Sequence, residues 1–414
     1  MFSEDTDPAR DLLARTAATD GLPVLRIGFI PLADCAPIIA AHVKGFAAAE
    51  GLALDLVRET SWANIRDRVA LGHFDAAHML GPMPIAGRLG LGHWKTPMLA
   101  PFVLNEGGNA VTVGIGLHEE MLATGETVDV FEPASTARAI ATVVARRATE
   151  GRPPLTVATV YPFSAHNYEM RYWLAAAGLD PDRDIRLVVV PPPLMVDALT
   201  SGNIEVFSVG APWPSLAVEA GVGRIVATKQ AVWPHSPEKV LGVREHFAQR
   251  SPEKLAALIR ALARAAAWCA DPDHMTELAA ILARAEIIGV EAEIILRGIT
   301  SRLVTRLGQP ATPIPHYMDF AFDGSNRPRI ADGMWFASQM VRWGQVADPD
   351  AAYEAARRAF DPAYFDAALG ADAPPAPAER PPQLFDGPVL DLADPGTYVA
   401  GFAIRRSARP DETF

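Results

Sequence analysis

Hydrophobic and polar positions form blocks that predict strand, loop and helix units along most of the chain. The first block, Leu25–Ile30, is a mostly apolar run rich in β-branched and aromatic residues, which predicts a strand buried on both faces. A loop follows, and the apolar spacing then predicts a helix over 38–43, with Pro37 in its first turn. Lys44 and Gly45 supply the cation and the glycine that helix ends favour. In an open α/β sheet, ligands bind where such strands end.

The same pattern recurs along the rest of the sequence. Further strands are predicted at Leu52–Val57, Phe74–Met79, Leu99–Val103, Ala110–Gly114, Leu155–Val160, Ile185–Val190, Ile204–Val209 and Arg224–Thr228. Helices are predicted at Ile65–Leu71, Ala134–Arg147, Tyr168–Ala177, Lys254–Cys269, Met275–Arg284 and Glu291–Leu307. Ser164 and Ser251 stand where they would cap two of these helices. Strands that alternate with helices predict an α/β protein with two mainly parallel sheets.

The order of these segments divides the chain into two lobes. The polar, glycine-bearing segment Asn105–Asn109 is interpreted as a crossing between them. The expected regions are an N-terminal extension (1–22), the first part of lobe I (23–115), lobe II (116–231), a helical return to lobe I (232–370) and a C-terminal tail (371–414). The tail starts as a proline-rich linker, and its later part has too much apolar surface for disorder. We therefore expect that part to dock as an extended segment or strand.

Composition narrows the class of ligand. The chain has 414 residues, which is too long for one ordinary core and suits two lobes. Lys+Arg number 37 and Asp+Glu number 49, which gives a net charge of −12. A protein this acidic has no general attraction to nucleic acid or to an anionic membrane. A small anion would have to be held by local charge and hydrogen-bond donors.

The N-terminus and the cysteines indicate the cytoplasm. Met1–Leu22 is polar and acidic, without the basic and apolar regions of a signal peptide, and no apolar run of about 18 residues occurs that could cross a membrane. Cys35 and Cys269 lie far apart and lack metal-ligand or redox-motif spacing, so we expect two buried free thiols. These features predict a cytoplasmic protein.

Catalytic, nucleotide and metal motifs are missing from the sequence. It contains no G-x-G-x-x-G after a strand, no G-x-S-x-G and no H-E-x-x-H. The ten histidines do not cluster along the chain, and His73 and His78 are expected to be one surface and one core histidine. The sequence therefore predicts no cofactor, no metal site and no enzyme.

Four hydrogen-bond donors stand at predicted loop positions. Trp62 follows the second strand, Asn109 lies in the crossing, His166 opens a helix of lobe II and Lys239 lies near the return to lobe I. Each alone also fits an ordinary structural role, such as a core tryptophan or a solvated lysine. Together they offer an indole N–H, an amide, an imidazole and an ammonium, which suit a small anion.

Blocks of sequence along nearly the whole chain resemble one known family. They read FIPLADCAPIIAA, SWANIRDRVALG, AAHMLGPMP, HNYEMRYWLAAAGLDPDRDI, VVVPPPLMVDAL, VGAPW, SPEKVLG and LFDGPVLDLADP. They resemble the nitrate-binding proteins of bacterial ABC importers, the related bicarbonate-binding proteins and, most closely, the cytoplasmic nitrate and nitrite sensor NasS. The resemblance implies a two-lobed periplasmic-binding-protein fold of type II, with the ligand in the cleft between the lobes.

The resemblance also implies which residues bind nitrate or nitrite. They are a tryptophan matching Trp62, a crossing amide matching Asn109, a histidine matching His166 and a lysine matching Lys239. Importers usually carry the longer glutamine where this chain has Asn109. Many relatives read G-E-P-W where this chain has Ala211 in place of the glutamate.

Three classes of function compete at this point. The first is a cytoplasmic sensor, which the resemblance pairs with an RNA-binding, response-regulator-like antiterminator (NasT-like) of nitrate assimilation genes. The second is the substrate-binding component of a nitrate ABC importer. The third is an enzyme on the same scaffold, such as the pyrimidine-forming proteins of thiamine synthesis, which would need a cofactor constellation that the sequence lacks. The polar Met1–Leu22 favours the sensor over the importer component.

Overall fold

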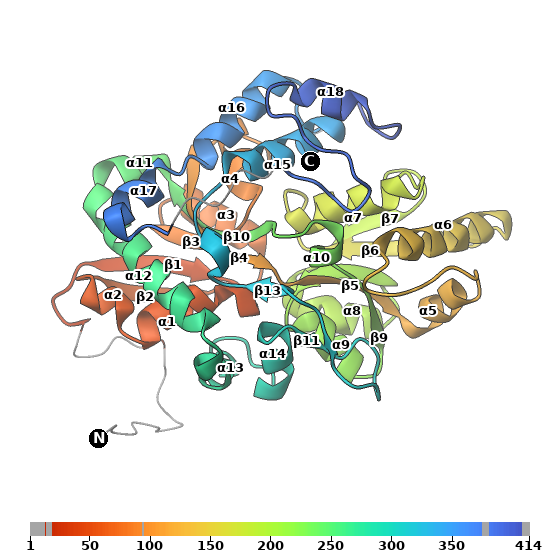
Figure 1. The fold of residues 1–414 in the computed structure, drawn as a ribbon, viewed down its shortest axis with the longest axis horizontal. Helices are drawn as coiled ribbons and strands as arrows, with labels where there is room; N and C mark the ends of the chain where they lie inside the picture. The colour runs from red at the N-terminus through yellow and green to blue at the C-terminus, as the bar shows by residue number, and fades with distance from the viewer. Residues whose placement is uncertain (1–12, 14–18, 93–94, 375–380, 408–414) are drawn as a thin grey trace.

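The computed structural model describes residues 13, 19–92, 95–374 and 381–407. Two separate β-sheets, each flanked by helices, form two lobes that lie side by side (Figure 1). The expected two-lobed α/β fold is therefore confirmed. Most of the predicted N-terminal extension and residues 375–380 of the predicted linker lie outside the described residues. Among the described residues, no helix is long and apolar enough to span a membrane.

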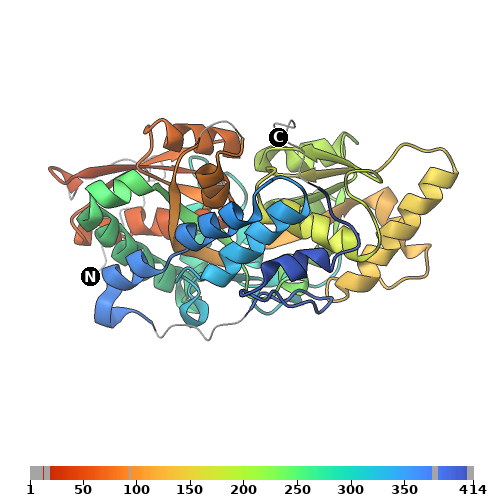
Figure 2. The ribbon, with the colours of Figure 1, turned by 90° about the horizontal axis from the view of Figure 1, so that it is seen from above.

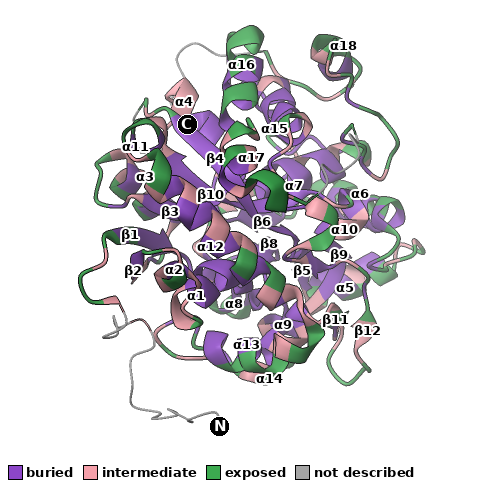
Figure 3. Ribbon diagram, turned by 60° about the vertical axis from the view of Figure 1, so that its left-hand side comes forward, coloured by how far each residue is buried: buried purple, intermediate pink, exposed green. Residues whose placement is uncertain are grey.

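The first sheet has the strand order β13-β4-β10-β3-β1-β2. Its strands are β1 (Val24–Phe29), β2 (Ala53–Arg58), β3 (Ala76–Leu80), β4 (Met98–Gly107), β10 (Pro237–Arg244) and β13 (Met318–Asp319). Helices of this lobe include α1 (Ala36–Val43), α2 (Phe46–Ala49), α3 (Trp62–Ala70), α4 (Met83–Leu89), α11 (Glu245–Arg250), α12 (Pro252–Ala270), α13 (Met275–Leu282), α16 (Pro349–Ala359) and α17 (Ala363–Leu369). Their inner faces and the strand centres are buried, whereas their outer faces are exposed (Figure 3).

The second sheet has the strand order β7-β6-β8-β5-β9. Its strands are β5 (Asn109–Gly114), β6 (Thr156–Thr159), β7 (Arg186–Val189), β8 (Val206–Gly210) and β9 (Gly223–Thr228). The helices nearby are α5 (Ile115–Leu122), α6 (Pro133–Thr149), α7 (Ala165–Ala176), α8 (Met195–Thr200), α9 (Trp213–Glu219) and α10 (Lys229–Val232). Because β5 pairs with β8 and β9, the chain changes sheet at Gly108 rather than after residue 115.

The prediction of mainly parallel sheets is correct only in part. β1 pairs in parallel with β2 and β3, and β6 pairs in parallel with β7 and β8. The strands that arrive from the other lobe, β5 and β10, run antiparallel to their neighbours. The reason is topological: Asn109 starts β5 beside Gly210 at the end of β8, and Lys239 near the start of β10 lies beside Leu80 at the end of β3. Both strands therefore begin at the edge where the parallel strands finish.

The helix predicted over Glu291–Leu307 is wrong in its second half. Helix α14 (Ala292–Ile299) stops early, because Ser301 adopts a left-handed backbone with φ of 56°. The following residues then form β11 (Arg302–Leu303), which pairs with β12 (Thr312–Pro313). Ser251 does precede α12 as expected, but its side chain makes no capping hydrogen bond. Ser164 caps α7 as predicted, because its hydroxyl accepts a hydrogen bond from Asn167 N at 3.0 Å.

The later part of the C-terminal tail docks on the folded lobes. It runs next to α15 (Ile330–Arg342) and onto the second lobe (Figure 2). Leu384 and Leu390 are buried, and Tyr172 Oη of α7 donates a hydrogen bond to Asp386 at 2.8 Å. Part of the tail forms α18 (Pro395–Ala400) rather than an extended strand, since Asp394 caps this short helix.

The two cysteines confirm the expectation of free thiols. Cys35 and Cys269 are both buried and unbridged. Burial raises the pKa of each thiol above its usual value, so both stay protonated at neutral pH.

Candidate functional site

A buried polar cluster lies where strand ends of the two sheets meet. Asp34 follows β1, Trp62 starts α3 after β2, and His78 lies in β3. From the second lobe, His166 stands in the first turn of α7 after β6. Lys239 lies near the start of β10, which comes from the second crossing. These side chains are at most 1% exposed, so the cluster is closed to solvent.

Lys239 is the centre of this cluster. Its Nζ lies 2.9 Å from Asp34 Oδ2 and 2.8 Å from Glu238 Oε1. Burial alone would lower the pKa of Lys239, but the two carboxylates outweigh it and the net shift is upward. Burial likewise raises the pKa of Asp34, but Lys239 and His78 reverse the shift, and Asp34 is ionised. The ammonium that the sequence offered to an anion is therefore held between two carboxylates.

A second cation completes the charge balance. Lys229, the first residue of α10, forms an ion pair with Glu169 of α7 and lies 3.4 Å from Glu238 Oε2. Burial has the largest single effect on the pKa of Glu238 and raises it, but the neighbouring cations together outweigh burial and lower this pKa to about 2. The pKa of Glu169 is raised to about 7, chiefly by burial and with Glu238 contributing. Two ammonium groups thus face two ionised carboxylates and a third carboxyl that titrates near neutrality.

Several donors of the cluster have no hydrogen-bond partner among the described residues. They are Trp62 Nε1, Asn109 Nδ2 and His166 Nε2, whereas His166 Nδ1 lies 3.2 Å from Glu238 Oε1. Lys239 Nζ lies 5.6 Å from the centre of the Trp62 ring. Buried donors without partners cost free energy, and a bound acceptor would remove that cost. A small oxyanion with several acceptor oxygens fits this set of donors.

The protonation of His166 matters for the charge of the site. Burial lowers the pKa of His166 to about 3, against the opposing influence of Glu238, so the ring is neutral in the absence of an anion. A neutral imidazole donates through one nitrogen only, and the imidazolium donates through both. An anion beside His166 Nε2 would therefore favour uptake of a proton.

Local sequence explains how the side chains are placed. Ser61 caps α3, since its hydroxyl accepts a hydrogen bond from Asn64 N at 3.2 Å, and this start of the helix fixes Trp62. Gly210 leaves the space beside Asp34 and Asn109, because a Cβ there would lie 3.2 Å from Asp34 Oδ2 and 3.3 Å from Asn109 Oδ1. The lobes also touch through the main chain, where Ala33 N donates to Ala211 O at 2.8 Å.

The structure brings all four predicted residues into this one region. Their secondary structure differs from the prediction, because Trp62 begins a helix and Asn109 and Lys239 lie in strands rather than loops. His73 is exposed and His78 is buried, as expected, but His78 Nε2 also lies 3.0 Å from Asp34 Oδ1 and so belongs to the cluster.

Sequence reasoning missed four charged members of the cluster. They are Asp34, Glu169, Lys229 and Glu238. Glu238 directly precedes Lys239, and this adjacency was the signal that could have found it. Nothing local marks Lys229 or Glu169, which are 60 residues apart and pair only in the folded chain.

Comparisons with known proteins bear on this site. A family model described as the NMT1-like family matches residues 19–283. The chain is 32% identical over 392 residues to the nitrate/nitrite binding protein NrtA of Synechococcus elongatus, which covers 92% of this chain and 86% of that protein. It is 35% identical over 393 residues to the nitrate import ATP-binding protein NrtC of Synechocystis, covering 94% of this chain. The chain spans only 56% of that longer protein.

A solved structure gives the same result for the fold. The crystal structure of the periplasmic nitrate-binding protein NrtA from Synechocystis superposes with a TM-score of 0.83 at 28% identity. The match covers 93% of this chain and 99% of that one. The similarity therefore extends over both lobes and the region between them where the polar cluster lies.

Proposed function

This chain belongs to the NMT1-like family and to the nitrate-binding proteins of the ABC-importer type, and on this premise we propose that it binds nitrate or nitrite between its lobes. The observation that carries the proposal is the set of buried, unpartnered donors on Trp62, Asn109 and His166 beside the ammonium of Lys239. Each lobe contributes donors, so an anion bound among them favours lobe closure.

Calorimetry tests the binding proposal directly. Purified protein is titrated with sodium nitrate and sodium nitrite, with sodium chloride and sodium sulfate as matched salts. We expect one nitrate or nitrite per chain and no comparable heat from chloride or sulfate. Failure of both nitrate and nitrite to bind would refute the proposal, and equal binding of all four anions would refute selectivity for the planar or bent nitrogen oxyanion.

For its cellular role, we propose first a substrate-binding part of a nitrate ABC importer. The relatives named for nitrate import support this role, including an ATP-binding protein of which this chain spans about half. The proposal predicts that nitrate-loaded protein stimulates ATP hydrolysis by importer complexes reconstituted in vesicles. The variant Lys239→Met serves as the control that should not stimulate.

The second candidate is the cytoplasmic nitrate sensor that the sequence blocks resemble. Its ligand would act by changing what the protein binds, and hinge closure is a two-state element that can do so. A net charge of −12 suits contact with the basic face of an RNA-binding antiterminator. Cell fractionation separates the roles, and so does mixing the protein with the antiterminator on a sizing column with and without nitrate. A complex that dissociates when nitrate is added supports the sensor. If no complex forms with or without nitrate, the result supports the importer component.

A further inference from the structure

Among the described residues, three of the stretches that run between the lobes lie side by side. The first is Gly107–Gly108 between β4 and β5, the second is 233–236 between α10 and β10, and the third is 304–317, which leads to β13. Gly107 N donates to Ser236 O at 3.2 Å, which joins the first stretch to the second. Tyr317 Oη donates to Gly108 O at 2.9 Å, which joins the first to the third. Hydrogen bonds therefore join these three stretches between the lobes.

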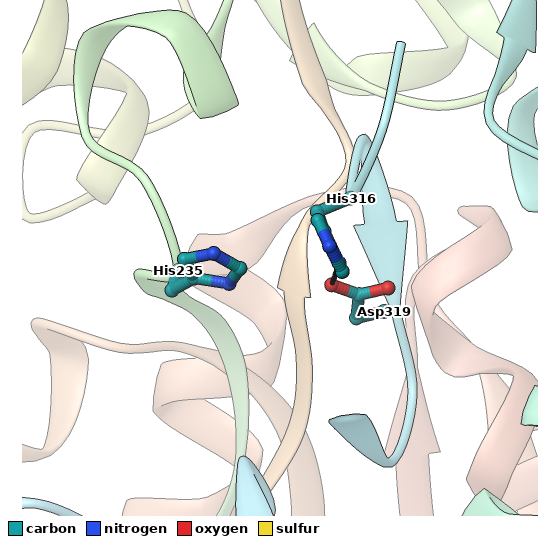
Figure 4. A group of neighbouring side chains, drawn as sticks. All are labelled: His235, His316 and Asp319. Carbon is teal, nitrogen blue, oxygen red and sulfur yellow. Dashed lines mark hydrogen bonds and ion pairs between the residues drawn. The ribbon is translucent and has the colours of Figure 1, made fainter. Parts of the chain in front are cut away.

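Metal-ligating side chains meet on these connections. His235 comes from the second stretch, and His316 and Asp319 come from the third stretch and the adjoining β13 (Figure 4). One ligand atom from each of the three lies within 4.8 Å of the others. His316 Nδ1 is 2.9 Å from Asp319 Oδ2. The histidines do not cluster along the chain, and the sequence did not reveal this group, because His235 and His316 are 81 positions apart and only the fold brings them together.

Further contacts fix this group in place. His235 and His316 have φ of 50° and 60°, in the left-handed region where glycine is the unstrained choice. Their rings lie 4.8 Å apart, and the His235 ring stacks on Phe322 at 5.4 Å. A second carboxyl group comes from the end of β4, where Glu106 Oε2 lies 3.8 Å from His235 Nδ1.

We propose that His235, His316 and Asp319 bind a divalent transition metal such as Zn²⁺ at the connection between the lobes. Two imidazoles and one carboxylate are a donor set that Zn²⁺ accepts, with a water completing four ligands. Zinc ligands at about 2.0–2.2 Å stand about 3.4 Å from one another, so small side-chain rotations would close the observed spacing. Glu106 places a second carboxyl group next to the proposed ion, and its other oxygen is paired with Arg329 at 3.2 Å. The ion would tie the second connection to the third.

Zinc titration tests the site without reference to nitrate. Untagged, chelator-treated protein is titrated with ZnCl2 by calorimetry, alongside His235→Gln and His316→Gln. The matched control is His246→Gln, because His246 is an exposed histidine outside the group. We expect one zinc per chain in the wild type and in the control, and at least about tenfold weaker binding in the two site variants. Circular dichroism confirms that each variant is folded.

Hydrogen exchange places the ion in the structure. With zinc, peptides covering 233–237 and 314–320 should exchange more slowly in the wild type and in His246→Gln, and should be unchanged in His316→Gln. The proposal would be overturned if all four proteins bound zinc equally or if the wild type bound none. It would also be overturned if zinc slowed hydrogen exchange only in other parts of the chain.

Discussion

Replacing Lys239 with methionine separates the two roles that the structure gives this lysine. Methionine keeps most of the length of the side chain but removes the ammonium. A charge-assisted hydrogen bond contributes about 1.5–3 kcal/mol, so nitrate binding should weaken by about 10- to 150-fold. Isothermal calorimetry of both proteins measures this change. An unchanged affinity would refute the assignment of Lys239 to the anion site.

The same substitution should also destabilise the fold. Asp34 and Glu238 lie 2.9 and 2.8 Å from Lys239 Nζ and would lose their main counter-charge. Removing one partner of a buried ion pair typically costs about 3–5 kcal/mol, although His78 and Lys229 would still contact these carboxylates. Urea unfolding measures the loss.

A double variant distinguishes charge balance from direct anion contact. In Lys239→Met with Asp34→Asn, one positive and one negative charge are removed together. We expect the free energy of unfolding to recover in part, whereas nitrate affinity stays at least about tenfold below the wild type. Recovery of both would contradict direct contact, because it would mean that the lysine only balances the carboxylates.

Four further predictions follow from other members of the cluster. Trp62→Phe keeps a buried ring but removes the unpartnered N–H, so nitrate affinity in calorimetry should fall by about 0.5–1.5 kcal/mol, or about 2- to 13-fold, and an unchanged value would exclude that donor. The pKa of His166 is about 3 without an anion, so anion binding that raises this pKa takes up a proton, and nitrate affinity should fall as pH rises from 5.5 to 8. His166→Asn should bind nitrate weakly and equally at each pH. A nitrate affinity of the wild type that does not change with pH would exclude the imidazolium form. The pKa of Glu169 is about 7 in the folded protein and about 4.3 in the unfolded chain, so the free energy of unfolding should fall as pH rises between these values, by up to about 1.4 kcal/mol per pH unit. Urea unfolding measured at several pH values should show a shallower fall for Glu169→Gln. Calcium with bicarbonate should not raise the unfolding temperature, because the ammonium of Lys239 lies where a dication would contact Asp34 and Glu238. A calcium-dependent rise in the unfolding temperature would contradict that arrangement.

Much of the fold could be predicted from local patterns. Apolar runs marked the strands β1 and β6, and a serine at the right spacing marked the start of α7. The placement of Trp62 and His166 could be predicted as well, because each follows a predicted strand and strand ends meet at one edge of a sheet. These features depend on neighbours within a few residues, and the sequence displays such neighbours directly.

Tertiary structure alone decided the electrostatics and the strand directions. The sequence predicted Lys239 only as a donor to an anion, but folding places Asp34, 205 positions earlier, 2.9 Å from its ammonium. The antiparallel run of β10 and the meeting of His235 with His316 have the same origin. Each depends on contacts between segments far apart in the chain, where hydrophobic periodicity carries no information about which buried charges will be neighbours. The strength of an ion pair depends on its distance and on the exclusion of water, and only the packed lobes set both.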